Sequence, residues 1–401
     1  MVFGASGQLG VELCAELGRR GYEVRGFGRA MIDISSGERV EQALAEFEPA
    51  AVFNAAAYNQ VDVAEREPVA AFEANALAVR NLALACRQND ARLVHFSTDY
   101  VFDGMLGRPY AESDAVHPLG AYAVSKLAGE LYAQAYLERP LIVRTSGVFG
   151  PAGRHTARGN FLELMLRLAR EGKPIRVVED HVASPTYAPL LASRSIDMLE
   201  RDLDGVFHCG GGQAVSWFDY ARLIFDKAGI GGDLQPTNER EYRTAARRPR
   251  YSALSNGKME RIGLGPMPTL REVLERYFAE RNRRVSGFPG KSSSTRTPRR
   301  RSGPSIRGTR AATRSIATWE MGRLRTSGMN LESRWGGGRG VPISGTSITT
   351  AWRTSMSRMG ISPVLTATTS PASSGGRWLP GRRRIQKRQR HTNMAGVPST
   401  S

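Results

Sequence analysis

Through the first 150 residues, short apolar runs alternate with longer stretches that have the composition of helices. Runs such as Leu93–Phe96, which are almost continuously apolar, are typical of strands buried on both faces of a sheet. Strands alternating with helices predict an α/β, Rossmann-type fold, in which a doubly wound parallel sheet is covered by helices on both faces. Strands are expected at Met1–Phe3, Tyr22–Gly26, Ala51–Ala55, Arg92–Ser97 and Leu141–Arg144, and helices at Gln8–Arg20, Gly37–Phe47, Pro68–Asn89 and Tyr122–Tyr136.

Residues 151–284 are less regular than the first 150. We expect them to form a smaller C-terminal substrate-binding lobe, intertwined with a cofactor-binding domain of residues 1–150. Helices are predicted at Phe161–Glu171, Thr186–Glu200, Ser216–Ala228 and Thr269–Arg281, with short strands near Ile175–Val178 and Gly205–Cys209.

The formal net charge of +18 is concentrated at the C-terminal end of the chain. Residues 285–401 contain 21 Lys and Arg but 2 Asp and Glu, whereas residues 1–284 contain 35 and 36. This composition predicts a disordered, Arg-, Ser- and Gly-rich basic tail. It is also what a frameshifted GC-rich gene would encode after a complete domain, and we favour this artefact over a genuine polyanion-binding segment. Nucleic-acid binding is therefore not expected outside the tail.

Other classes of protein are disfavoured by residue counts and spacing. The three cysteines form no CxxC pair, which argues against a disulfide framework, and the six histidines lack metal-ligand spacing. No apolar run approaches the roughly 20 residues of a membrane span. The first residues lead into a strand and a Gly-rich turn rather than a signal peptide. We expect a cytoplasmic protein with no metal and no membrane partner.

The segment Gly4–Gly10 (GASGQLG) joins the first predicted strand to the first helix. Glycines allow a tight turn and close backbone approach, and the helix N-terminus offers N–H groups to a pyrophosphate. We expect a dinucleotide to bind at Gly4, Gly7, Gln8, Leu9 and Gly10.

After the second predicted strand, no acidic residue stands where one would bind the ribose hydroxyls of NAD. Arg29 could face a 2′-phosphate instead, which favours NADPH over NADH, or it could face solvent. Asp33 and Ile34 follow and are expected to flank the adenine.

Tyr122 and Lys126 are four residues apart on one predicted helix, so their side chains share a face. A neighbouring ammonium would lower the pKa of the Tyr122 phenol and let it exchange a proton with a substrate oxygen near neutral pH. Lys126 could also hold the nicotinamide ribose. Thr98 ends a buried strand, at the sheet edge where α/β proteins bind ligands, and could hydrogen-bond the same substrate oxygen.

These motifs together resemble the extended short-chain dehydrogenase/reductases and, within them, the dTDP-4-dehydrorhamnose reductase family. The resemblance covers residues 1 to about 280 and includes Asn54–Glu65 (NAAAYNQVDVAE), Ser97–Gly104 (STDYVFDG), Tyr122–Glu130 (YAVSKLAGE), Arg144–Gly150 (RTSGVFG) and Arg247–Gly263 (RRPRYSALSNGKMERIG). It implies NADPH-dependent reduction of the C4 ketone of a nucleotide-linked 4-keto-6-deoxy sugar, with NADH as the alternative cofactor. The family often forms homodimers, some with Mg²⁺ at a dimer contact, so a homodimer is open here as well.

Carried over position by position, the resemblance assigns Thr98, Tyr122 and Lys126 as the catalytic set. It places Ala57 and Tyr58 against the cofactor, and Thr98 and Asp99 beside the sugar. The family commonly has Trp where this chain has Gly147, and that Trp packs on the sugar. We therefore expect Gly147 to leave a wider, less specific sugar pocket.

The residues leave two alternatives open. One is another sugar-nucleotide epimerase or reductase of the extended short-chain family; a dehydratase is disfavoured because Tyr100, not an acidic residue, follows Asp99. The other is a non-catalytic, dinucleotide-binding regulatory subunit, which the intact Thr98, Tyr122 and Lys126 set argues against.

Overall fold

The computed structural model describes residues 1–155 and 159–286. Apart from its first two residues, the predicted basic tail at 285–401 lies outside the described residues. The main sheet is built from β1 (Val2–Phe3), β2 (Gly26–Phe27), β3 (Ala51–Asn54), β4 (Arg92–Thr98), β5 (Leu141–Thr145) and β8 (Gly205–His208). All six strands are parallel, in the order β2-β1-β3-β4-β5-β8. Their carboxyl ends therefore share one edge of the sheet.

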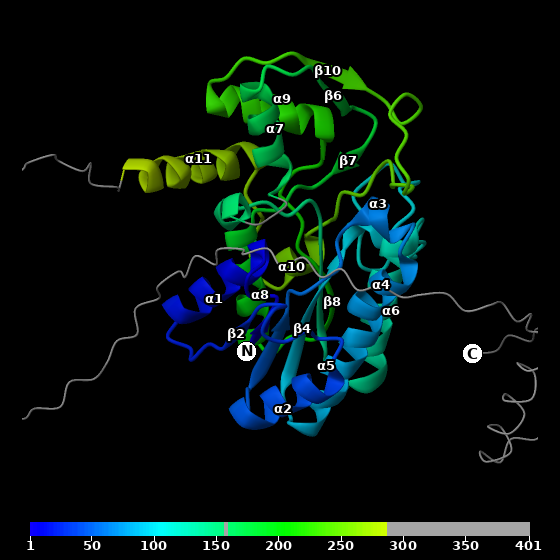
Figure 1. Cartoon of the computed structure of the whole chain (residues 1–401), viewed down its shortest axis with the longest axis vertical. Coiled ribbons are helices and arrows are strands. Elements are labelled where there is room, and N and C mark those ends of the chain that lie inside the picture. The colour runs from blue at the N-terminus through cyan, green and yellow to red at the C-terminus, as the bar shows by residue number, and fades with distance from the viewer. Residues whose placement is uncertain (156–158, 287–401) are drawn as a thin grey trace, which may run out of the picture. The chain divides into compact units, whose positions relative to one another are not determined.

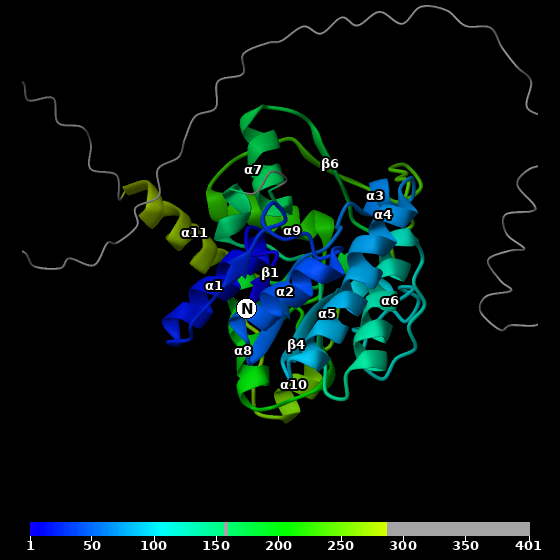
Figure 2. The same cartoon turned by 60° about the horizontal axis from the view of Figure 1, so that its bottom comes forward.

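Helices cover both faces of this sheet, as Figures 1 and 2 show. One face carries α1 (Gln8–Arg19), α8 (Ala188–Glu200) and α10 (Gly257–Arg261), and the other carries α2 (Gly37–Phe47), α5 (Ala78–Gln88) and α6 (Ala121–Tyr136). Leu13, Ile196 and Met259 pack against the first face, and Leu44 and Leu82 against the second. The predicted Rossmann-type architecture is confirmed.

The segment Pro68–Gln88 is long and apolar enough, by length and composition alone, to cross a membrane. It contains α4 (Pro68–Phe72), a π-helical turn (Glu73–Leu77) and α5, and it follows α3 (Val61–Ala64). Half of its 18-residue apolar window, of mean hydropathy 1.3, is buried within the protein, where Val79 and Leu82 pack in the core. We interpret the segment as a core helix, but its length is at odds with the prediction that no apolar run approaches that of a membrane span.

A smaller lobe lies at the carboxyl edge of the main sheet, in the upper part of Figure 1. It contains α7 (Phe161–Arg170), β6 (Ile175–Val178), β7 (Val182–Ala183), β9 (Val215–Ser216), α9 (Trp217–Ala228), β10 (Leu234–Thr237) and α11 (Leu270–Ser286). Strands β6 and β10 pair in parallel, and β7 and β9 pair antiparallel. Leu166, Tyr220 and Tyr277 form part of its core. Because α8, β8 and α10 return to the main sheet, the two regions alternate along the chain.

The predicted strand at Tyr22–Gly26 is wrong, because β2 begins only at Gly26. Tyr22 is half exposed and donates a hydrogen bond from its hydroxyl to Glu200 Oε1 at 3.0 Å. Val24 packs against the core beside α1 and α8 without strand pairing, whereas Tyr22 contacts α8 through its hydroxyl. Short elements whose pairing partners are distant in sequence, such as β7 and β9, were not predicted.

Candidate active site

A pocket of about 570 Å³ opens where the carboxyl edge of the main sheet meets the smaller lobe. Its volume is within the range of roughly 300–1,000 Å³ that is typical of small-molecule sites. It brings together six residues predicted from sequence, namely Gly7, Gln8, Thr98, Asp99, Tyr122 and Gly147. Asn59, Val61, Ser97, Tyr100, Thr145, Val148, Gly159, Asn160 and Trp217 also line it.

The turn between β1 and α1 has the geometry of a phosphate-binding loop. Gly4 has a φ of +77°, and a Cβ on it would lie 2.5 Å from the Ala56 nitrogen. A Cβ on Gly10 would lie 2.1 Å from the Gly4 carbonyl oxygen, so this glycine lets α1 pack against the turn. Gly7 is the N-cap of α1, and no side chain of residues 1–155 or 159–286 caps the first turn. The N–H groups of that turn are therefore available to an anionic diphosphate, which a dinucleotide would supply.

Gln8 connects the phosphate-binding turn to the smaller lobe. Its Nε2 donates to the Val148 carbonyl at 2.8 Å, and its Oε1 accepts a bond from Asn160 Nδ2 at 2.8 Å. Asn160 in turn caps α7, because its side chain accepts a bond from the Glu163 nitrogen at 2.9 Å. The same glutamine that begins α1 thus holds the start of α7 in place.

Thr98 and Tyr122 face the pocket from neighbouring elements. Thr98 is the last residue of β4, and its hydroxyl donates to Asp99 Oδ1 at 3.1 Å and accepts from the Tyr100 nitrogen at 3.2 Å. Tyr122 lies in the first turn of α6. Burial raises the pKa of the Tyr122 phenol to about 12, against the opposing effect of a hydrogen bond with Thr98. A phenol of this kind stays protonated at neutral pH and can act as a proton donor.

The lowered phenol pKa that the spacing of Tyr122 and Lys126 predicts is not found, because the effect of burial on the Tyr122 pKa dominates. Lys126 is buried, and its Nζ donates to the Phe96 carbonyl oxygen at 2.6 Å. Burial lowers the pKa of the Lys126 ammonium to about 8, although Glu130 one turn away favours the charged form. The lysine thus lies directly behind the end of β4, where its charge is bonded to a backbone oxygen.

A buried ion pair supports this part of the sheet. Arg144, on β5, donates from Nη2 and Nε to the carboxylate of Glu130, on α6, at 2.7 and 2.9 Å. Both side chains are almost fully buried, and the Ser97 hydroxyl donates to the same carboxylate. The pair ties α6, which carries Tyr122 and Lys126, to the two strands beside it.

Asp99 is buried in the pocket wall among hydroxyl groups. Its Oδ2 accepts bonds from the Ser146 hydroxyl at 2.8 Å and the Ser252 hydroxyl at 2.5 Å, and Thr98 donates to its Oδ1. Burial raises the pKa of the Asp99 carboxyl to about 6, and these hydrogen bonds oppose the shift. The three hydroxyl donors come from three separate segments, so Asp99 holds these segments together in the pocket wall.

The remaining predicted cofactor residues lie outside this pocket. Arg29 is largely exposed and pairs with Asp33 at 3.2 Å, whereas the Ile34 side chain belongs to the core of the sheet. Ala57 is exposed, and the backbone of Tyr58 is held on both sides by the Asn75 amide. Leu9, in the first turn of α1, packs against the core.

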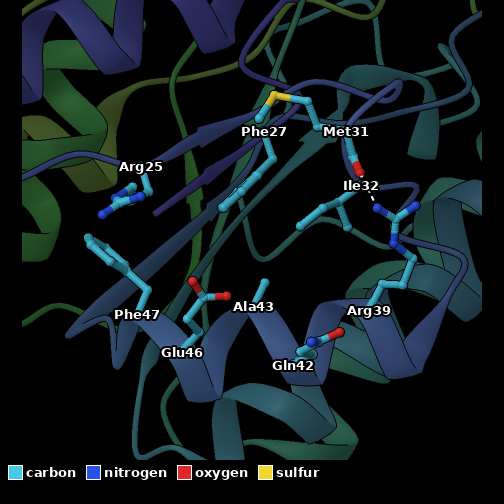
Figure 3. A pocket seen from close by; sticks show the side chains of 9 residues that line it. All are labelled: Arg25, Phe27, Met31, Ile32, Arg39, Gln42, Ala43, Glu46 and Phe47. Atoms are coloured by element: carbon cyan, nitrogen blue, oxygen red, sulfur yellow. Dashed lines mark hydrogen bonds between the residues drawn. The ribbon is translucent and has the colours of Figure 1, made fainter.

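A second pocket, of about 320 Å³, lies between β2 and α2 and is shown in Figure 3. Two arginines line this pocket. The guanidinium of Arg25 lies 5.3 Å from the ring centre of Phe47, and Arg39 donates to the Met31 carbonyl at 2.6 Å. None of the predicted site residues lines this pocket.

Several residues of the site were not predicted from the sequence. Asn75, in the π-helical turn, bonds the Tyr58 backbone and also donates to the Ser125 hydroxyl at 3.0 Å. Asn160 and Trp217 reach the pocket from the starts of α7 and α9. Thr145 ends β5 with a buried hydroxyl that has no hydrogen-bond partner among the described residues. A π-turn is a recognised mark of functional segments, but single-sequence patterns do not show it.

The expectation that Gly147 leaves a wider, less specific sugar pocket stays a prediction, and the structure shows what borders this position. A Cβ on Gly147 would lie 3.4 Å from both Trp217 Cη2 and Pro185 Cα. The space beside Gly147 is therefore already bordered by a tryptophan from another part of the chain.

The parallel sheet, the glycine turn and the hydroxyl-lined pocket together define an oxidoreductase of the extended short-chain dehydrogenase/reductase class. Residues 1–283 match the family described as RmlD substrate binding domain, and the chain belongs to this family. The membership in the dTDP-4-dehydrorhamnose reductase family inferred from the motifs is thereby confirmed.

Two curated relatives illustrate the similarity. The dTDP-4-dehydrorhamnose reductase of Escherichia coli is 37% identical over 275 residues, which cover 65% of this chain and 90% of that protein. The spore coat polysaccharide biosynthesis protein SpsK of Bacillus subtilis is 36% identical over 282 residues, which cover 70% and 97%. Among solved structures, a dTDP-4-dehydrorhamnose reductase from Bacillus anthracis in complex with NADP is 35% identical, with a TM-score of 0.67 over 70% of this chain and 98% of that chain.

Proposed function

We propose that the protein reduces the C4 ketone of a dTDP-linked 4-keto-6-deoxy sugar with NADPH, in the cytoplasm. The observation that carries this proposal is the convergence of Gly7, Thr98 and Tyr122 on one pocket large enough for a small ligand. The similarity to reductases named for this substrate, and to one solved with NADP, supports it. NADPH, when bound, supplies a hydride for the carbonyl carbon.

Each residue has a distinct part in this reaction. The N–H groups in the first turn of α1, which follow Gly7, bind the diphosphate of the dinucleotide, and Gln8 lies at the start of that turn. Thr98 hydrogen-bonds the C4 carbonyl oxygen, and Tyr122 donates its phenolic proton to that oxygen, so that the ketone becomes a secondary alcohol. The hydroxyl of Thr145, which has no hydrogen-bond partner in the part of the chain that the structure describes, is a further group available to the bound molecules.

Lys126 compensates the charge that this proton transfer creates. Loss of the proton leaves a phenolate on Tyr122, which burial disfavours. The Lys126 ammonium, with its pKa of about 8, is mostly protonated at neutral pH and stabilises the phenolate across one helical turn. We also propose that this amine, whose Nζ donates to the Phe96 carbonyl in the structure, holds the nicotinamide ribose when the cofactor is bound.

We also propose that residues 1–150 bind the cofactor and that residues 151–284 bind the nucleotide sugar. Asn160 and Trp217, which reach the pocket from the second region, support this division.

The test is an isotope transfer assay on the full chain. The protein is incubated with dTDP-4-keto-6-deoxyglucose, or with its C3,C5 epimer dTDP-4-dehydrorhamnose, and NADPH deuterated on the nicotinamide C4. We expect NADPH oxidation and deuterium at C4 of a dTDP-6-deoxyhexose, detected by mass spectrometry and NMR. Absence of NADPH oxidation with either sugar would refute the proposal, and conversion of the sugar without consumption of NADPH would indicate an epimerase instead.

A further inference from the structure

Trp217 is a rigidly held aromatic residue on the lobe side of the pocket. It is the first residue of α9, and its backbone N–H donates to the His181 carbonyl at 3.1 Å. The preceding Ser216 caps the helix by accepting a bond from the Asp219 nitrogen at 3.0 Å. The indole packs edge-on against Phe161, with ring centres 4.8 Å apart. These contacts leave the indole half-buried, with part of it exposed to the pocket.

Gly147 lies beside the indole in the same part of the pocket wall. Gly147 has a φ of +50°, a conformation that favours glycine, and a Cβ there would meet Trp217 Cη2 at 3.4 Å. A side chain extending beyond Cβ would have to occupy space that the indole and Pro185 now border. The backbone at residue 147 and the indole therefore form one continuous surface, with the aromatic part supplied by α9.

Three of the residues that line the pocket are aromatic, and two of these, Tyr100 and Tyr122, pack against each other. Tyr122 presents its hydroxyl, and Tyr100 packs edge-on against Tyr122 with ring centres 6.2 Å apart. Trp217 is the one of the three that approaches from the smaller lobe. A 6-deoxyhexose presents a methyl group and axial C–H bonds, and an apolar aromatic face in a partly closed pocket buries such groups favourably.

We propose that Trp217 is the residue against which the 6-deoxyhexose ring packs, and that Trp217 and Gly147 together determine which sugars bind. This inference rests on the proposed function for the identity of the ligand. It assigns sugar selectivity to the start of α9, which lies 70 residues along the chain from the end of β5 where Gly147 lies.

Equilibrium binding to the full chain separates sugar contacts from nucleotide contacts. The affinities of dTDP and of dTDP-rhamnose are measured for wild type, Trp217→Leu, Trp217→Ala and Trp217→Phe. We expect the leucine and alanine variants to bind dTDP-rhamnose at least tenfold more weakly while their affinity for dTDP changes less than twofold. Trp217→Phe, which keeps an aromatic ring, should retain most of the affinity for dTDP-rhamnose.

Tryptophan fluorescence gives an independent readout. Trp217 is the only one of the five tryptophans that lies among the described residues; the others are Trp319, Trp335, Trp352 and Trp378. We expect dTDP-rhamnose to change the emission of wild type, and this change to be absent in Trp217→Phe although the ligand still binds.

The outcomes separate the two proposals. If wild type binds dTDP-rhamnose and the leucine variant binds it equally well, the role of Trp217 is refuted while the proposed function stands. Equal weakening for dTDP and dTDP-rhamnose would also refute it, because the indole would then contact the nucleotide or support the fold. If wild type binds neither ligand, both proposals are overturned.

Discussion

The two sides of the active-site pocket are built in different ways. On the sheet side, Thr98 and Thr145 end neighbouring parallel strands that pair in register, and Tyr122 lies in the first turn of the helix between those strands. On the lobe side, Asn160 and Trp217 stand at the starts of helices that follow irregular segments. We infer that the regular side carries the hydride and proton chemistry, whereas the irregular side selects the sugar.

The contribution of the sheet side to stability can be tested at the buried pair of Glu130 and Arg144. We expect Glu130→Ala to lower the free energy of unfolding by about 3–5 kcal/mol, because it leaves a buried guanidinium without its partner. Urea denaturation of both proteins measures this loss.

Glu171→Ala is the matched control, since Glu171 pairs with Lys173 at the surface of the lobe. An exposed pair of this kind contributes about 0–1 kcal/mol. Equal losses in the two variants would show that the sheet side has no special dependence on its buried pair.

The sheet side could be predicted from the sequence because its positions follow from local periodicity. In a parallel sheet, a glycine turn that follows a strand lies at the carboxyl edge of the sheet. A tyrosine and a lysine four residues apart on a helix share one face of that helix. Trp217 could not be placed, because its neighbour Gly147 belongs to a strand end 70 residues earlier.

The pKa values of the site residues could likewise not be predicted from the sequence. The spacing of Tyr122 and Lys126 suggested a lowered phenol pKa, but burial, which depends on the whole fold, raises that pKa to about 12. The start of β2 was misplaced for a related reason, since the packing of Tyr22 beside Glu200 is a tertiary contact.

Asp99 gives a pH signature on the sheet side of the pocket. Its pKa is about 6 in the folded protein, above its ordinary value of 3.8, so the folded state binds this proton more tightly than the unfolded state. The contribution of Asp99 to the free energy of unfolding therefore falls as pH rises from about 4 to 6, by about 3 kcal/mol for a shift of this size. Asp99→Asn should lack this decrease in thermal melts.

Asp33→Asn is the control of opposite sign. The pKa of the Asp33 carboxyl is lowered by hydrogen bonds from Ser35 and by Arg29. Its contribution to stability is present above pH 4 and is lost as pH falls further. If the Tm of Asp99→Asn and the Tm of wild type change by the same amount between pH 4 and 6, the raised pKa of Asp99 is refuted.

The hydrogen bond between Gln8 and Asn160 links the two sides of the pocket. A double-mutant cycle of Gln8→Ala and Asn160→Ala should show a coupling of about 0.5–1.5 kcal/mol in unfolding free energy. Asn160→Ala alone should cost about 1 kcal/mol more through loss of the cap on α7. Strict additivity of the two substitutions would show that the two sides are energetically independent.

Arg29 is expected to produce the smallest effect. If it contacts the 2′-phosphate, Arg29→Ala should raise the KM for NADPH about fivefold, or about 1 kcal/mol, and leave the KM for NADH unchanged. Steady-state kinetics with both cofactors measure this. Equal changes, or none, would mean that this exposed side chain serves only its ion pair with Asp33.

The central claim is that Tyr122 supplies the proton when the sugar ketone is reduced. Its most direct test is the kcat of NADPH oxidation with saturating dTDP-4-keto-6-deoxy sugar, compared between wild type and Tyr122→Phe. The phenylalanine variant keeps the ring and lacks the acid, so we expect kcat to fall about 10²–10⁴-fold with unchanged NADPH affinity. A Tyr122→Phe variant that turns over at the wild-type rate would contradict this account of the site.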